Sequence, residues 1–66
     1  MNIVVNSNNI EFTQNNLSEL LVQIQMSEKK GIAIALNNSV VPKANWQKTQ
    51  LKENDKITII TATQGG

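Results

Sequence analysis

Residues 57–66 read ITIITATQGG, a β-branched run that leads into two polar residues and two glycines. The run Ile57–Ala62 has the length and the composition of a β-strand. Residues 63–66 carry nothing that can pack against a core, so we expect a flexible tail. Because glycine has no Cβ and accepts almost any backbone conformation, Gly65 and Gly66 form a thin tether for the α-carboxylate.

Two interpretations of this tail are open from its residues alone. Four extended residues reach at most about 14 Å, so the tail can enter a narrow channel and present its carboxylate inside another protein. The alternative is a frayed or solubilising terminus without any chemistry. The remainder of the chain has to decide between them.

The composition disfavours several classes of function. The sequence has 66 residues with neither cysteine nor histidine, so we expect no disulfide, no metal site and no histidine base. Its net charge of +1, without a clustered basic face, argues against a nucleic-acid binder. No apolar run approaches the ~20 residues of a membrane span, and the N-terminus does not resemble a signal peptide. We expect a cytoplasmic protein with one domain over residues 1–62, binding neither membrane nor cofactor.

The N-terminal residues predict a β-hairpin. Ile3-Val4-Val5 and Ile10-Glu11-Phe12-Thr13 are β-branched or alternating runs, separated by an Asn-rich turn. Side chains of a strand alternate between its two faces. The apolar residues of both runs can therefore share one face: Ile3, Val5, Ile10 and Phe12.

The next segment predicts one amphipathic helix over about residues 17–27, with an apolar stripe at helical spacing. The stripe consists of Leu17, Leu20, Leu21 and Ile24, widened by Val22 and Met26. Asn16 is the expected N-cap, and Glu19 completes a capping box. Lys29 and Lys30 suit the negative end of the helix dipole, and Gly31 is the expected stop.

The second half of the chain predicts three more strands. Residues 32–36, IAIAL, are apolar on both faces, as expected of a central strand. Val40-Val41 predicts a short edge strand, which ends at Pro42 because proline cannot donate to a ladder. Trp46 and Leu51 are expected to anchor the following connection to the core, although Trp46 is also a candidate contact residue. Residues 53–56 predict a turn, with carboxylates that serve the turn.

The resulting element order predicts an α+β fold, with a mixed sheet of four to five strands and one helix packed on one face. A short hairpin cannot join the first and the last strand. If these two strands lie side by side at the centre of the sheet, they run parallel. That arrangement is the ubiquitin-like β-grasp.

Several motifs along the chain resemble those of one known family. The motifs are ALNNSVVPK at residues 35–43, Trp46, NDKI at residues 54–57 and the final Gly65-Gly66. Together they resemble the ThiS family, the small sulfur-carrier proteins of thiamine biosynthesis. Two positions depart from the family pattern: Asn54 stands where glycine is common, and Gln64 where a small residue is frequent.

The resemblance implies a division of labour between this chain and partner enzymes. An E1-like adenylyltransferase of the ThiF type would use ATP to adenylate Gly66. Sulfur from a cysteine desulfurase persulfide would then replace AMP and leave a C-terminal thiocarboxylate. A thiazole synthase of the ThiG type would take the sulfur into the thiazole of thiamine. Gly66 is the implied covalent carrier, Gly65 and Gln64 thread the tail, and the chain itself contributes no catalytic residue.

Partner recognition needs a surface, and the last strand offers one. If the helix covers the face that holds Ile57 and Ile59, the opposite face stays open. An exposed apolar patch rimmed by polar residues is a candidate docking site, although scattered apolar residues on an open sheet are also ordinary. The candidate docking residues are Ile60, Ala62, Thr58, Ala33 and Ala35, with Val4 beside them.

Other functions stay open on the residues themselves. The small subunit of molybdopterin synthase uses the same tail on the same fold, but the short length and the Val-Pro-Lys-x-x-Trp segment favour the thiamine branch. A ubiquitin-like modifier attached to lysines and a plain interaction module are further alternatives. An enzyme in its own right is the least favoured, because the sequence contains no histidine, cysteine or nucleotide-binding loop.

Overall fold

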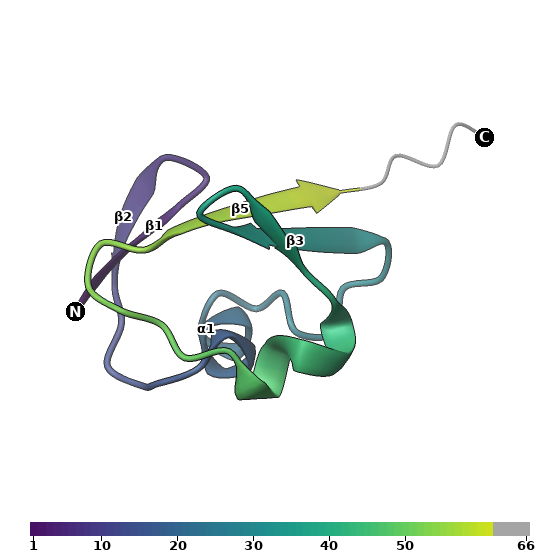
Figure 1. The fold of residues 1–66 in the computed structure, drawn as a ribbon, viewed down its shortest axis with the longest axis horizontal. Coiled ribbons are helices and arrows are strands. Elements are labelled where there is room, and N and C mark those ends of the chain that lie inside the picture. The colour runs from purple at the N-terminus through teal and green to yellow at the C-terminus, as the bar shows by residue number, and fades with distance from the viewer. Residues whose placement is uncertain (62–66) are drawn as a thin grey trace.

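The computed structural model describes residues 1–61, which form a five-stranded sheet with α1 and a 3-10 helix, η1, on one face (Figure 1). The elements in chain order are β1 (Asn2–Val5), β2 (Asn8–Glu11), α1 (Leu17–Gln23), β3 (Ile32–Leu36), β4 (Ser39–Val41), η1 (Lys43–Lys48) and β5 (Lys56–Thr61). The strand order across the sheet is β2-β1-β5-β3-β4. The predicted α+β class with a mixed sheet is confirmed.

The last strand occupies the centre of the sheet, as the sequence predicts. β5 runs parallel to β1, with Val5 paired to Ile57. It runs antiparallel to β3 from the Leu36–Ile57 pair to the Ile32–Thr61 pair. The N-terminal strand and the C-terminal strand therefore lie side by side, with β2 beyond β1 and the β3–β4 hairpin beyond β5.

Both hairpins close through two-residue turns in the left-handed region of the backbone. Asn6 and Ser7 have φ of 48° and 71°, and Asn37 and Asn38 have φ of 50° and 73°. Positive φ at both central positions is the requirement of a type I′ turn, whose twist matches that of the flanking strands. Three of the four positions hold asparagine, which tolerates this conformation better than most residues.

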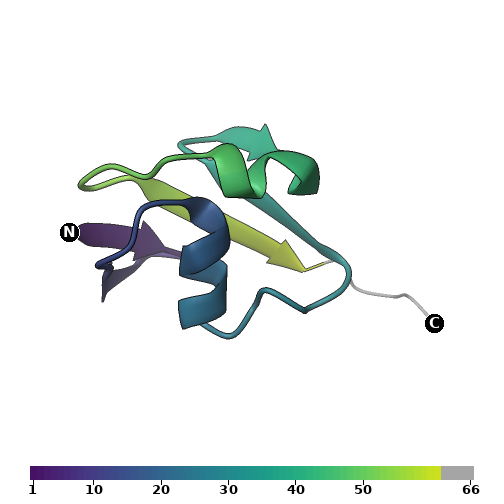
Figure 2. The ribbon, with the colours of Figure 1, turned by 90° about the horizontal axis from the view of Figure 1, so that it is seen from below.

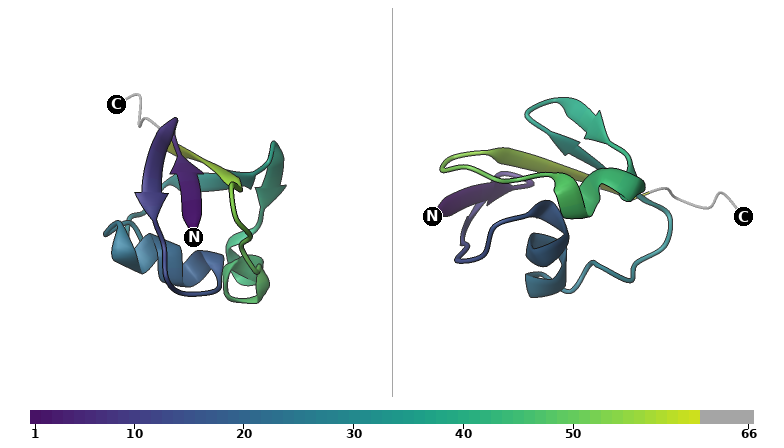
Figure 3. Two further views of the ribbon diagram at one scale, coloured as in Figure 1. Left: turned by 90° about the vertical axis from the view of Figure 1, so that its left-hand side faces the viewer. Right: turned by 60° about the horizontal axis from the view of Figure 1, so that its bottom comes forward.

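The core lies between the sheet and the helices. Figures 2 and 3 show α1 and η1 on the same side of the sheet. No element of residues 1–61 covers the other face of the sheet. The predicted hairpin face is confirmed, because Ile3, Val5 and Phe12 are buried and Ile10 is partly buried. The buried cluster contains Ile3, Val5, Phe12, Leu17, Leu20, Leu21, Ile34, Trp46, Leu51, Ile57 and Ile59.

The start of α1 follows the sequence prediction closely. The side-chain oxygen of Asn16 accepts a hydrogen bond from the backbone N–H of Glu19 at 2.9 Å. The Glu19 carboxylate in turn accepts one from the backbone N–H of Asn16 at 3.1 Å. This reciprocal pair is a capping box, which satisfies two backbone donors that would otherwise lack a partner.

The predicted end of the helix was wrong, because α1 stops at Gln23 and not near residue 27. Gln25 adopts φ of 63° and donates its N–H to the carbonyl of Val22 at 3.0 Å. The N–H of Met26 donates to the carbonyl of Leu21 at 2.7 Å. These two bonds form a Schellman motif, which normally uses glycine where this chain has Gln25.

The predictions for three further residues, one within α1 and two after it, were also wrong. Val22 is 61% exposed and does not widen the buried stripe. Lys29 and Lys30 lie in the loop after α1, and the last turn of the helix contains no basic residue. They therefore do not complement the helix dipole.

The connection between β4 and β5 is anchored as predicted, although its first part is a 3-10 helix. Trp46 is only 7% exposed, and its indole N–H donates to the carbonyl of Val41 at 2.9 Å. Leu51 is 6% exposed and joins the same core. Lys43 lies over the Trp46 ring, 6.0 Å from its centroid. Trp46 is thus an anchor by its burial and its hydrogen bond.

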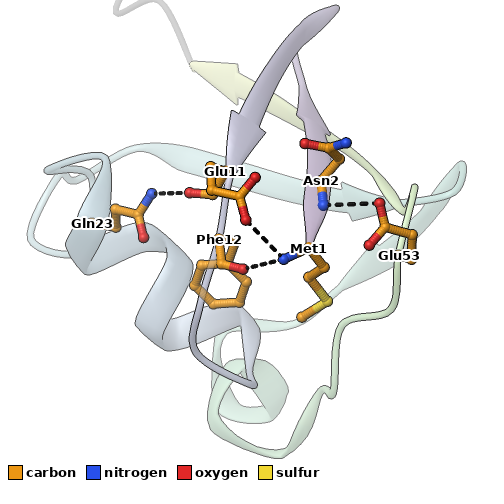
Figure 4. A network of polar contacts seen from close by, with 6 residues as sticks. All are labelled: Met1, Asn2, Glu11, Phe12, Gln23 and Glu53. Carbon is orange, nitrogen blue, oxygen red and sulfur yellow. Dashed lines mark hydrogen bonds and ion pairs between the residues drawn. The ribbon is translucent and has the colours of Figure 1, made fainter.

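The acidic residues before β5 serve the turn, as predicted. Asp55 accepts a hydrogen bond from the backbone N–H of Lys52 at 2.7 Å, while Glu53 accepts one from the backbone N–H of Asn2 at 3.0 Å (Figure 4). Asn54 has φ of 70°, so it supplies the left-handed position for which glycine is common in the family that the sequence resembles. The turn is thereby tied to the start of β1.

A second set of polar contacts joins β1, β2 and α1 (Figure 4). The Met1 ammonium donates to the carbonyl of Phe12 at 2.7 Å and to the carboxylate of Glu11 at 3.1 Å. The side-chain amide of Gln23 donates to the carbonyl of Glu11 at 2.8 Å. These bonds hold the end of β2 against both the neighbouring strand and the end of the helix.

Candidate functional site

β5 leads directly into the tail that the sequence analysis singles out. Thr61 is its last described residue, paired with Ile32 of β3. The predictions for Ala62, Gln64, Gly65 and Gly66 lie outside the described residues. The structure therefore describes the base from which the tail begins, and that base is the central strand of the sheet.

The beginning of β5 is held by the turn between β3 and β4. Asn37 donates its backbone N–H to the carbonyl of Lys56 at 2.8 Å, and its side-chain oxygen accepts from the N–H of Lys56 at 3.0 Å. The Asn37 side-chain amide also donates to the carboxylate of Asp55 at 3.1 Å. Asn37 thus extends the hydrogen bonding between β3 and β5 to Lys56, the first residue of β5.

A second asparagine does the same on the β1 side, further along β5. Asn6 donates its backbone N–H to the carbonyl of Ile57 at 2.9 Å and then turns away into the hairpin. Its side-chain oxygen accepts from the N–H of Ile59 at 2.8 Å, and its side-chain nitrogen lies 3.5 Å from the Ile59 carbonyl. The side chain replaces the backbone of β1 where the strand has ended, so β5 is held on both edges up to Ile59.

Sequence reasoning assigned Asn6 to a turn and did not find this second role. The signal for the turn is local, since asparagine favours left-handed backbone. The bond to Ile59 joins residues 53 positions apart. It follows only from the parallel register of β1 and β5, which no local pattern contains.

The open face of the sheet carries most of the predicted docking residues at its surface. Ile60 is 52% exposed, and Ala33, its direct partner in register, is also exposed. Thr58 is exposed on the same face. Ala35 is the exception, because it is only 8% exposed between its register partners Thr58 and Val40. Ala35 therefore lies beneath this surface and adds little area to it.

Val40 is a surface residue that the prediction missed. It is 70% exposed, and it pairs with Ala35 on the open face. The signal was present in the sequence: successive residues of a strand point to opposite faces, so a buried-side Val41 places Val40 on the open side. We define the open-face patch as Ala33, Val40, Thr58 and Ile60.

The charged groups of the described residues do not form a metal or catalytic cluster. Within residues 1–61, no group of three or more His, Cys, Asp or Glu side chains could hold a metal ion. The Met1–Glu11 contact is the one ion pair found in that part of the chain. No helix in residues 1–61 has both the length and the apolar character needed to cross a membrane.

Comparison with known proteins assigns the family. The family model described as ThiS family matches residues 2–66, nearly the whole chain. This chain belongs to the ThiS family. The uncharacterized protein ycf40 of Trieres chinensis is similar to it as well, with 35% identity over 51 residues that cover 77% of this chain and 68% of that protein. Membership of the family supports a role as a sulfur carrier in thiamine biosynthesis.

Solved structures confirm the fold of this ThiS-family chain. The crystal structure of thiamine biosynthesis protein ThiS from Geobacter metallireducens matches with a TM-score of 0.84 at 23% identity, over all of both chains. The solution structure of a thiamine biosynthesis protein from the same organism matches with a TM-score of 0.77 at 23% identity, over all of this chain and 88% of that one. The ubiquitin-like β-grasp predicted from the sequence is thereby confirmed.

Proposed function

We propose that this protein carries sulfur for the thiazole moiety of thiamine as a thiocarboxylate on Gly66. The observation that carries the proposal is the family match over residues 2–66, which includes the terminal diglycine. The position of β5 supports it, because the tail begins from the central strand of the sheet, which is paired on both edges. The point at which the tail leaves the fold is therefore fixed when a partner binds the tail.

The chemistry requires an enzyme from outside the chain. An α-carboxylate is ionised at neutral pH and is a poor electrophile. An E1-like adenylyltransferase of the ThiF type joins it to the α-phosphate of ATP and releases pyrophosphate. The terminal sulfur of a cysteine desulfurase persulfide then attacks the adenylate and displaces AMP, which leaves an acyl disulfide. A reducing thiol cleaves the S–S bond of that disulfide and releases the thiocarboxylate, whose sulfur a thiazole synthase of the ThiG type receives. ATP is thus a substrate of the partner and not a cofactor of this chain.

Each part of the chain has one task in this proposal. Gly66 is the reacting residue, while Gly65 and Gln64 pass through the partner's channel, where a large side chain next to the carboxylate would obstruct the passage. Asn6 and Asn37 fix the strand that aims the tail. The open-face patch identifies the carrier to its partners, since an apolar centre with a polar rim is the usual anatomy of an interface.

The composition supports a carrier that is acted on by enzymes. The sequence contains no histidine, no cysteine and no nucleotide-binding loop. The two carboxylates with the closest resemblance to a catalytic pair both accept hydrogen bonds from backbone amides: Asp55 from Lys52 in the turn, and Glu53 from Asn2 at the start of β1. These carboxylates therefore stabilise the backbone before β5.

Reconstitution with purified partners tests the proposal and separates it from its alternatives. We expect the thiocarboxylated chain to supply sulfur to a thiazole synthase and to produce the thiazole. Transfer to the large subunit of molybdopterin synthase instead would assign the chain to that branch. Attachment of the chain to lysines of other proteins, detected as branched peptides that carry the diglycine, would favour the ubiquitin-like modifier.

A further inference from the structure

The loop between α1 and β3 brings two lysines to the place where the tail begins. Ile32, the first residue of β3, pairs with Thr61, the last described residue of β5. The residues just before Ile32 therefore lie at the end of the sheet from which the tail starts, as Figures 1 and 3 show for this loop. Lys29 and Lys30 are both exposed there. We call residues 27–31 the basic loop.

The conformation of the basic loop is fixed by its backbone. The N–H of Lys29 donates to the carbonyl of Met26 at 3.1 Å, which closes a turn after the end of α1. Gly31 adopts φ of 74°, a value that favours glycine, and directs the chain into β3. The two lysines are thus carried on a defined turn between two elements of the fold.

The fold makes no use of the charges of Lys29 and Lys30. They lie beyond the last turn of α1, and neither forms an ion pair with a residue in positions 1–61. Glu28 is the nearest acidic residue in sequence, and it is exposed as well. The other four lysines of the chain lie elsewhere in the sequence: Lys43, Lys48, Lys52 and Lys56.

We infer that the basic loop docks against an acidic rim at the mouth of the channel that receives the tail. The inference deepens the proposed function and rests on it, because it requires a partner that takes up the tail. The basic loop is continuous with the open-face patch: Ala33 follows it in β3 and pairs with Ile60. An apolar centre with a charged rim is the arrangement in which rim charges set orientation and association rate.

The length of the tail indicates a protein rim and not the phosphates of the nucleotide. The five residues 62–66 reach at most about 17 Å when extended. When the Gly66 carboxylate reacts at the bottom of a channel, most of this extended length separates it from the basic loop. The lysines then face the protein surface that surrounds the entrance, and the charge that complements two ammonium groups is acidic.

The test measures association with the E1-like adenylyltransferase of the same organism. It is separate from the experiments that measure sulfur transfer to Gly66. The variant Lys29→Glu/Lys30→Glu is compared with Lys48→Glu/Lys52→Glu, whose positions lie on the segment from η1 to the start of β5, away from the tail (Figure 1). Both variants take the net charge from +1 to −3, since each exchange subtracts two charges. They are thus matched in overall charge and differ in position.

We expect Lys29→Glu/Lys30→Glu to lower the association rate constant about tenfold or more at low salt. We also expect it to flatten the dependence of that rate on ionic strength between about 0.03 M and about 0.3 M. Lys48→Glu/Lys52→Glu should stay within about threefold of the unchanged chain. A thermal melt of each variant checks that the fold survives, as expected for exposed side chains.

Equal effects of the two double variants would overturn the inference, since net charge and not position would then matter. No effect of either would overturn it too. Failure of the proposed function would give a different result. The unchanged chain would then acquire no sulfur, whatever the salt dependence of its binding to the enzyme.

Discussion

The side-chain oxygen of Asn6 accepts a hydrogen bond from the backbone N–H of Ile59 at 2.8 Å, across 53 positions of sequence. The same asparagine occupies a left-handed turn position, with φ of 48°. One residue therefore ends β1 and takes the place of β1 in the ladder. Ile59 lies two residues before the last described position of β5, so this bond helps to hold the strand from which the tail starts.

Replacing Asn6 by glycine isolates the bond from the turn. Glycine accepts the left-handed conformation, so Asn6→Gly removes only the side chain that reaches Ile59. We expect a loss of about 1–2 kcal/mol in the free energy of unfolding, because a partly buried N–H loses its acceptor. Denaturant unfolding measures it, and faster hydrogen exchange at the Ile59 amide should accompany it.

Asn38→Gly is the matched control for this prediction. Asn38 has φ of 73°, and no hydrogen bond of its side chain to residues 1–61 is found. Its replacement should change stability by no more than about 0.5 kcal/mol. Similar losses for both variants would mean that Asn6 acts through the turn alone.

Replacing Trp46 by phenylalanine distinguishes an anchor from a contact residue. The change removes the indole N–H that donates to Val41 and leaves a small void. We expect a loss of about 1–2 kcal/mol of stability, with unchanged affinity for the adenylyltransferase at temperatures below the transition. Reduced affinity of a fully folded Trp46→Phe variant would contradict the anchor role.

The open-face patch predicts that a charge on it blocks docking. Ile60→Asp should weaken association with the adenylyltransferase at least about tenfold, and Val40→Asp should weaken it as well. Val22→Asp is the control, because Val22 is 61% exposed on α1, on the covered side of the sheet. If Val22→Asp weakens binding as much as Ile60→Asp does, the open face has no special role.

The end of α1 predicts a stabilising substitution. Gln25 holds φ of 63° at the position where a Schellman motif favours glycine. Gln25→Gly should raise the free energy of unfolding by about 0.5–1 kcal/mol, since it relieves the left-handed cost of a residue with a Cβ. Gln25→Ala keeps the Cβ and should bring no gain, so a gain from both variants would point to another cause.

The sequence predicted the features of the fold that follow from local pattern. Alternation and helical spacing placed the strands and the buried stripe of α1, and Asn16 with Glu19 marked the start of the helix. The parallel direction of β1 and β5 was predicted on the condition that the two strands lie side by side, as they do. Glycine was the expected helix stop, so Gly31 was chosen, whereas the Schellman motif formed six residues earlier at Gln25.

The site was less predictable because its features depend on register. The burial of Ala35 results from its neighbours Thr58 and Val40 on adjacent strands. The hydrogen bond between Asn6 and Ile59 and the approach of the basic loop to the start of the tail arise in the same way, from segments far apart in sequence. Local composition predicts none of these relationships, whereas the terminal diglycine is visible directly in the sequence.

The intact mass of the chain after reaction tests the central claim most directly. The protein is incubated with ATP, the E1-like adenylyltransferase, a cysteine desulfurase, cysteine and a reducing thiol, beside a chain that lacks Gly66. The account predicts that the unchanged chain gains the mass difference between a sulfur and an oxygen atom, and that the shortened chain gains nothing. An unchanged mass in a sample that demonstrably binds the enzyme would contradict the account.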